Sequence, residues 1–157
     1  MSKMTIRHFG FVALAAVFLA PIAMAQPAGI PGEIADYWSW TRVNIDRFTD
    51  NTTGAHPQPK DVYINLDPSE FVGPDEVAAV PFPEGTIIIK ERNDTVQLLV
   101  DRLYMMEKVD GAWIYSFFDR QADGSFSPRS FGAAPNLCSD CHQAAPTDFV
   151  FVQFEHR

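Results

Sequence analysis

The spacing of apolar residues divides the chain into a helix-like N-terminal part and a strand-rich remainder. In the first part, apolar residues and one threonine recur at helical spacing with polar residues between them; the set is Ile34, Tyr37, Trp38, Thr41, Ile45 and Phe48. This spacing predicts one amphipathic helix over residues 34–48. Residues 50–60 are turn-forming types throughout, so we expect the helix to end before them.

From residue 61 onward, the chain consists of short runs rich in β-branched and aromatic residues, bounded by Pro, Gly, Asn or Asp. Five strands are predicted, over residues 62–66, 86–91, 95–109, 112–120 and 149–154. Asp110-Gly111 joins the third strand to the fourth and is typical of a tight hairpin. Residues 121–137 are predicted to form a polar loop. The expected fold class is α+β, mainly β: an antiparallel meander with an N-terminal helix and a short C-terminal helix.

The first 25 residues have the pattern of a secretory signal peptide. Lys3 and Arg7 precede an apolar stretch over residues 9–20, and the small-residue pattern Ala23-Met24-Ala25 follows. A membrane anchor is the alternative, but the stretch is shorter than the roughly 20 residues that span a bilayer, and Pro21 interrupts it. We therefore expect export to the periplasm, cleavage after Ala25, and no membrane attachment afterwards. Residues 26–33 are expected to be a flexible leader, and residues 34–157 a single domain.

The charge of the chain limits its partners. Twenty acidic residues outnumber twelve basic ones, which gives a formal net charge of −8. This acidic balance argues against nucleic acids and anionic membranes as partners. A soluble, basic redox partner is compatible with it.

The chemistry of the chain is concentrated in Cys138-Ser139-Asp140-Cys141-His142. This is a C-x-x-C-H motif, the pattern of c-type haem attachment. Two thiols on one helical turn can form thioether bonds to the two porphyrin vinyl groups, and the adjacent imidazole can bind the iron. We expect one covalently attached haem c, with Cys138, Cys141 and His142 as its binding residues and His142 as the iron ligand. The predicted signal peptide and the predicted haem motif support each other, because haem is attached in this way only after export.

Two other uses of the cysteines are weaker. A redox disulfide of the thioredoxin kind would need a βαβ context, which the sequence lacks here. A structural zinc ion would need four protein ligands, and beyond the expected signal peptide only His56 and His156 remain as nitrogen donors besides His142. The motif therefore favours haem.

The late position of the motif bears on the second axial ligand. Fifteen residues follow His142 and none is methionine, so any second ligand must come from upstream. Met105 or Met106 would make a six-coordinate electron-transfer centre, although methionines in strands more often fill the core. His56 is a further candidate, but its Pro-rich loop predicts an exposed side chain.

Several blocks, spread over residues 62–154, resemble the cytochrome P-460 family, which includes the β-sheet cytochromes called cytochrome c-prime-beta. They are Val62-Tyr63-Ile64 with Asp67-Pro68, the run Phe82-Pro83-Glu84-Gly85-Thr86-Ile87-Ile88-Ile89-Lys90-Glu91, Trp113-Ile114-Tyr115 with Phe117, and the cysteine motif followed by Thr147-Asp148-Phe149-Val150-Phe151. The resemblance implies a periplasmic β-sheet protein, often a homodimer, with the motif histidine on one side of the iron. It also implies an open side that meets nitric oxide or hydroxylamine.

The resemblance implies a special role for Lys90. In the hydroxylamine-oxidising members, a lysine at the matching position is cross-linked to the porphyrin edge. From the residues alone, strand alternation puts Lys90 on the face of Thr86 and Ile88. A strand-end lysine with its ammonium group in solvent is the other interpretation.

The resemblance also implies a distal carboxylate that accepts a proton, in the strand before Trp113. Direct alignment puts Met105 or Met106 there, and a shift of two residues would make Glu107 the catalytic base. Met105 and Glu107 should share a strand face that Met106 does not. The expected functions are hydroxylamine oxidation, which would make the protein an enzyme using Lys90 and Glu107, or nitric oxide binding without catalysis. A six-coordinate electron carrier is the alternative.

Overall fold

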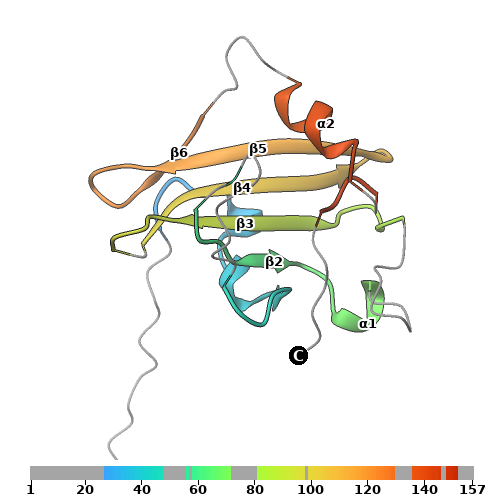
Figure 1. Ribbon diagram of the computed structural model, residues 1–157, viewed down its shortest axis with the longest axis horizontal. Helices are drawn as coiled ribbons and strands as arrows, with labels where there is room; N and C mark the ends of the chain where they lie inside the picture. The colour runs from blue at the N-terminus through green and yellow to red at the C-terminus, as the bar shows by residue number, and fades with distance from the viewer. Residues whose placement is uncertain are drawn as a thin grey trace, which may run out of the picture.

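The computed structural model describes residues 27–47, 56, 58–71, 81–97, 99–129, 136–145 and 148–151. Its main element is a six-stranded antiparallel sheet in which spatial order follows chain order (Figure 1). The strands are β1 (Thr41–Arg42), β2 (Val62–Ile64), β3 (Ile87–Asn93), β4 (Val100–Val109), β5 (Ala112–Arg120) and β6 (Phe126–Pro128). Two short helices, α1 (Pro68–Phe71) and α2 (Leu137–His142), accompany the sheet. The predicted mainly β fold is confirmed.

The hairpin between β4 and β5 forms the longest pairing in the sheet. Its register runs from Arg102 opposite Asp119 to Val109 opposite Ala112. Asp110 and Gly111 both have positive φ, at 52° and 77°. A two-residue turn that matches the twist of antiparallel strands needs this geometry, and Asp-Gly adopts it readily. The prediction made from this dipeptide is confirmed.

The predicted N-terminal helix over residues 34–48 is wrong. The described part of that segment forms two 3-10 turns, Gly32–Ile34 and Tyr37–Ser39, and then enters strand β1. Ile34 and Tyr37 are buried as the helical spacing predicted, but Trp38 and Ile45 are 42% and 44% exposed. Pairing of β1 with β2 outweighs local helix formation here, because β-branched residues at this point favour an extended chain.

Other boundaries also differ from the prediction. Strand β6 lies inside the expected loop 121–137, and strand β4 begins five residues later than predicted, at Val100. Of the expected strand 149–154, Val150 forms only an isolated bridge, and residues 152–154 lie outside the described residues. The predicted signal peptide, residues 1–25, lies outside them as well. No helix within the described ranges is long and apolar enough to cross a membrane.

The expected flexible leader packs against the sheet from Ala28 onward. The Phe126 N–H donates to the Ala28 carbonyl at 2.7 Å. Gly29 has a φ of 84°, and any Cβ there would collide with the Phe126 carbonyl oxygen. Glycine is required at this close approach. The leader therefore runs along β6 and helps to cover the sheet.

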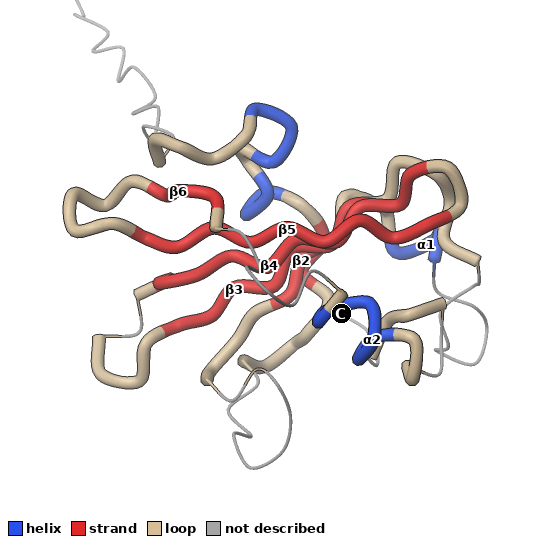
Figure 2. The backbone as a smooth tube through the Cα atoms, turned by 90° about the horizontal axis from the view of Figure 1, so that it is seen from above, coloured by secondary structure: helices blue, strands red, loops and turns tan. Residues whose placement is uncertain are grey.

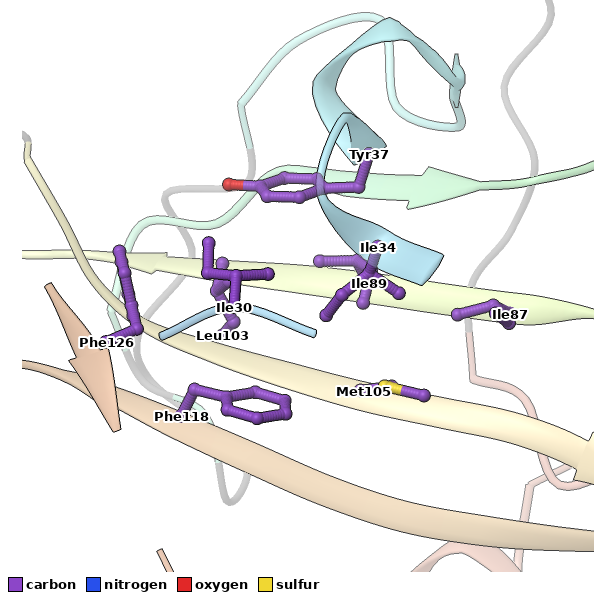
Figure 3. Close-up of a cluster of buried hydrophobic side chains, with 9 residues drawn as sticks. All are labelled: Ile30, Ile34, Tyr37, Ile87, Ile89, Leu103, Met105, Phe118 and Phe126. Carbon is purple, nitrogen blue, oxygen red and sulfur yellow. The ribbon is translucent and has the colours of Figure 1, made fainter. Parts of the chain in front are cut away.

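The sheet buries apolar side chains on both faces, because consecutive strand residues point in opposite directions. We call the face covered by the N-terminal segment the N-terminal face. Figure 3 shows its cluster: Ile30, Ile34, Tyr37, Ile87, Ile89, Leu103, Met105, Phe118 and Phe126. We call the opposite face, which helix α2 approaches along β5, the α2 face (Figures 1 and 2). Its cluster includes Val62, Ile64, Ile88, Met106 and Val150.

Asp61 holds the N-terminal segment against the sheet. Its carboxylate accepts hydrogen bonds from Arg42 at 2.5 Å, Asn44 at 3.0 Å and Arg47 at 2.7 Å. Asp61 is 2% exposed. Burial alone would raise the pKa of Asp61, but the donors from Arg47, Asn44 and Arg42 more than offset this, and the pKa is lowered.

We expect Asp61→Asn to reduce the free energy of unfolding by about 2 kcal/mol, because it leaves the buried Asn44 amide and two partly buried arginines without their charged acceptor. A depressed native pKa stabilises the fold above the ordinary aspartate pKa, and this contribution is lost as the pH falls through the native value. Urea unfolding at neutral and acidic pH measures both effects. Asp101→Asn is the control, since its pair with Arg92 is more exposed and should contribute under 1 kcal/mol. Equal losses in the two variants would contradict the account.

Candidate functional site

A cavity lies between the α2 face of the sheet and the C-terminal part of the chain. The space between its walls, open solvent included, is about 470 Å³. The sheet lines it with Ile88, Lys90, Tyr104, Met105, Met106, Tyr115 and Ser116. Cys138, His142, Val150, Phe151 and His56 complete the lining. Most of these side chains are apolar or aromatic, and no carboxylate is among them.

Helix α2 presents the cysteine motif to this cavity. Cys138 and Cys141 stand three residues apart on a six-residue helix, so they lie on neighbouring turns of one side. Cys138 is half-buried in the cavity wall, Cys141 is exposed, and both are free thiols. Burial raises the pKa of Cys138. The Asn136 carbonyl accepts from the Asp140 N–H at 2.8 Å and closes the first turn.

His142 is the buried end of the motif, with 9% of its surface exposed. Its Nδ1 lies 2.7 Å from the Phe149 carbonyl oxygen. Since a carbonyl only accepts, Nδ1 carries the proton and Nε2 keeps its lone pair. Burial lowers the pKa of His142, against the opposing effect of the Phe149 hydrogen bond, so the ring is neutral. A neutral imidazole oriented through Nδ1 is the usual form of a histidine that binds a metal through Nε2.

The carbonyl that orients His142 belongs to a constrained segment. Asp148 and Phe149 both have positive φ, at 42° and 66°. Lys108 donates to both Asp148 carboxylate oxygens at 3.0 Å, and the Trp113 indole N–H donates to the Asp148 carbonyl at 2.8 Å. These contacts join the segment to β4 and β5. They hold Phe149 where its carbonyl meets His142.

We expect Asp148→Ala to lower the free energy of unfolding by about 3 kcal/mol, because it leaves the buried Lys108 ammonium without its partner. It should also release the Phe149 carbonyl, so that His142 populates both neutral tautomers. Nitrogen-15 chemical shifts of the ring in the apoprotein measure the tautomer directly. Glu84→Gln is the control, as Glu84 accepts from Gly111 on an exposed turn. A single, unchanged His142 tautomer in Asp148→Ala would argue against this arrangement.

Lys90 lines the cavity and does not simply end a strand in solvent. It pairs with Val62 on one side and Tyr104 on the other, and it shares the α2 face with Ile88 as alternation predicted. Burial, with the nearby charge of Lys60, lowers the pKa of Lys90 to about 8. Within the described residues no carboxylate lies at salt-bridge distance from its ammonium group. Its amine is therefore partly neutral near physiological pH.

The structure places Glu107 away from the cavity. Glu107 pairs with Ile87 and Ile114, on the N-terminal face, whereas Met106 pairs with Ile88 and Tyr115 on the α2 face. Glu107 and Met105 do share a face, as predicted: Met105 borders the cavity, but its side chain packs in the cluster of the N-terminal face. A shift of two residues along a strand keeps the face of the starting residue, so moving from Met105 to Glu107 cannot bring a carboxylate into the cavity.

His56 is the cavity residue whose burial sequence reasoning missed. Its ring lies edge-on to Tyr104, with centroids 4.3 Å apart. Burial, together with the charges of Lys90 and His142, lowers the pKa of His56 to about 3. Nothing in the local sequence indicated this, because the surrounding prolines and polar residues predict an exposed loop. The contact with Tyr104 on β4, a residue distant in the sequence, places His56 at the site.

Tyr115, which belongs to one of the blocks that carry the family resemblance, brings a buried polar group to the cavity. Its ring packs against His142, with centroids 5.3 Å apart. Its hydroxyl is buried and has no hydrogen-bond partner among the described residues. Burial and Cys138 raise the pKa of Tyr115 to about 12. The phenol is therefore neutral and available as a donor.

The residues of the cavity fit a c-type haem. A free Nε2 on His142, two cysteines on one helix side, and an apolar wall of Ile88, Met106 and Phe151 match what the prosthetic group requires. The unpartnered buried atoms His56 Nδ1 and Tyr115 Oη are polar groups that a bound molecule could satisfy. Nowhere in the described part of the chain, this cavity included, do three His, Cys, Asp or Glu side chains gather to hold a metal ion.

Models of known protein families give no match to this chain, and neither do curated protein sequences. The resemblance to the cytochrome P-460 family therefore rests on the sequence blocks alone.

Proposed function

We propose that this chain is an exported mono-haem c-type cytochrome of the cytochrome P-460 type that binds a small nitrogen species at the open side of its haem. The observation that carries the proposal is that Lys90, far from the cysteine motif in the sequence, lines the same cavity as Cys138 and His142. His142 supports it further, since its Nδ1 is occupied and its Nε2 is free.

Four residues would hold the haem. Cys138 and Cys141 would form the thioether bonds, His142 would bind the iron, and Lys90 would contact the porphyrin edge from strand β3. When bound, the haem supplies an iron centre that coordinates small uncharged nitrogen ligands and exchanges single electrons. The polarity of the residues on the open side of the haem, and the access that they leave to the iron, decide whether ligand binding or electron transfer dominates.

The chain's own residues favour ligand binding over hydroxylamine oxidation. Oxidation releases protons and needs an acceptor, yet the lining residues that the structure describes include no carboxylate. Glu107, the predicted base, faces the other side of the sheet. Lys90 is a lining amine, and with a pKa of about 8 it holds its proton for most of the time at neutral pH. Nitric oxide binding requires only the open site and apolar walls, so it is the preferred function.

A six-coordinate electron carrier is the second candidate, and Met106 favours it. Met106 is 8% exposed and faces the cavity from β4. Thioether ligation would raise the reduction potential and close the site to small ligands. Packing against Ile64 and Ile88 in the core cluster is the simpler role for this side chain.

The periplasmic location, the homodimer and a soluble redox partner belong to the same proposal. They follow from the signal-peptide pattern and the resemblance, and the acidic chain suits a basic redox partner.

The absorption spectrum of the exported holoprotein tests the proposal. We expect a five-coordinate, high-spin ferrous spectrum that changes stoichiometrically on addition of nitric oxide, with little turnover of hydroxylamine. A low-spin ferrous spectrum with sharp bands, unresponsive to nitric oxide, would support the electron carrier and overturn the ligand-binding function. Steady hydroxylamine turnover would establish the enzyme instead.

A further inference from the structure

We propose that His56 contacts the small ligand on the open side of the haem, where its imidazole N–H donates a hydrogen bond to the bound molecule. The inference rests on the proposed haem site and adds the residue that would face the ligand. It concerns a side chain outside the motif and outside the blocks that carry the family resemblance.

The first argument is position on the sheet. His142 packs on Tyr115, which belongs to the row Ile88–Met106–Tyr115. His56 packs on Tyr104, which belongs to the next row on the same face, with Lys90 and Phe117. Such rows are about 7 Å apart, since a strand rises about 3.4 Å per residue. The two imidazoles therefore line one cavity from neighbouring rows, and a group held by His142 would turn its other side toward His56.

The second argument is that the position of His56 is fixed while its ring nitrogen is available. The Lys60 ammonium donates to the His56 carbonyl oxygen at 2.8 Å, and Tyr104 supports the ring. Nδ1 is buried without a hydrogen-bond partner among the described residues. An unsatisfied buried polar group is costly, and such groups in folded proteins call for a bound partner or a functional role.

The third argument excludes the other polar lining groups from this role. Tyr115 also has an unpartnered hydroxyl, but its ring contacts His142, so it lies on the iron-ligand side. Lys90 emerges from the sheet itself, at the position that would meet the porphyrin edge. His56 is a polar lining group that lies outside both the sheet strands and helix α2 and packs on Tyr104. A neutral imidazole carries one N–H donor, which suits a ligand without charge.

Carbon monoxide bound to the ferrous holoprotein is a suitable probe, because its stretching frequency responds to a neighbouring donor. His56→Phe keeps a ring against Tyr104 and removes both nitrogens, while His56→Gln keeps a donor. In His56→Phe we expect a higher C–O stretching frequency and dissociation about tenfold faster, the loss of one hydrogen bond. His56→Gln should remain close to the wild-type protein on both measures. Haem content after denaturation should be equal in all three.

Two results would overturn the inference while leaving the haem site intact. One is an unchanged stretching frequency and dissociation rate in His56→Phe at full haem content. The other is a low-spin wild-type spectrum that becomes high-spin in His56→Phe, which would make His56 an iron ligand instead. A second measurement needs no variant: transfer of the wild-type complex to D₂O should shift the C–O band, and an invariant band would also overturn the inference. A wild-type protein without haem would overturn the haem site and this inference together.

Discussion

Replacing Cys138 and Cys141 together by alanine should abolish covalent haem attachment. The chain has two cysteines in total, so the double variant leaves no thiol to form a thioether bond. The free thiols lie on one side of α2, and Cys138 faces the cavity. Haem-dependent peroxidase staining after denaturing electrophoresis measures the attached haem. We expect a strong band for the wild-type protein and none for the variant.

Asp140→Asn is the matched control for this experiment. Asp140 lies between the cysteines on the same helix, is exposed and does not line the cavity. Its staining should equal that of the wild-type protein. Equal staining in the double-cysteine variant would show that the haem, if present, is held elsewhere.

Replacing Lys90 by leucine should produce the second large effect, a displaced ferrous Soret band. Lys90 is a partly neutral amine at the cavity wall, and its substitution removes the polar group that would meet the porphyrin edge in the proposed haem site. Leucine keeps the apolar stem and fits the strand. The absorption spectrum of the reduced holoprotein measures the displacement at equal haem content.

Glu107→Gln is the control for Lys90→Leu, since Glu107 points to the opposite face of the sheet. Its spectrum should match the wild-type spectrum. An unchanged Soret band in Lys90→Leu would remove Lys90 from the haem site. Digestion with trypsin tells a Lys90 that only contacts the haem from one that is cross-linked to it. Trypsin does not cleave after a cross-linked lysine, so the peptide of residues 61–92 would stay attached to the haem peptide.

Local signals in the sequence were sufficient for much of the sheet. Asp110-Gly111 supplies two positive φ angles where the hairpin needs them, and β-branched and aromatic runs locate β3 and β5. Alternation alone was enough to put Lys90 on the face of Ile88. These features depend on neighbours within a few residues, so the sequence displays them directly.

Features that depend on distant pairing were not predictable in the same way. The spacing of Ile34 and Tyr37 fits a helical turn, and only pairing of β1 with β2 decides that the chain then extends. The alternation of strand residues correctly put Glu107 and Met105 on one face of the sheet. Which face borders the cavity depends on the contact of α2 with β5, and alternation cannot predict that contact. His56 depends on the same long-range arrangement. Residues far apart in sequence build this site, and no local pattern encodes which of them meet.

The mass of the C-terminal tryptic peptide tests the central claim most directly. Cleavage after Arg129 releases residues 130–157, which contain Cys138, Cys141 and His142 and no further basic residue before the terminal arginine. Isolated from the exported protein, this peptide is predicted to carry the mass of one haem, with both thiols blocked. An unmodified peptide with two free thiols, or with a disulfide between them, would contradict the account.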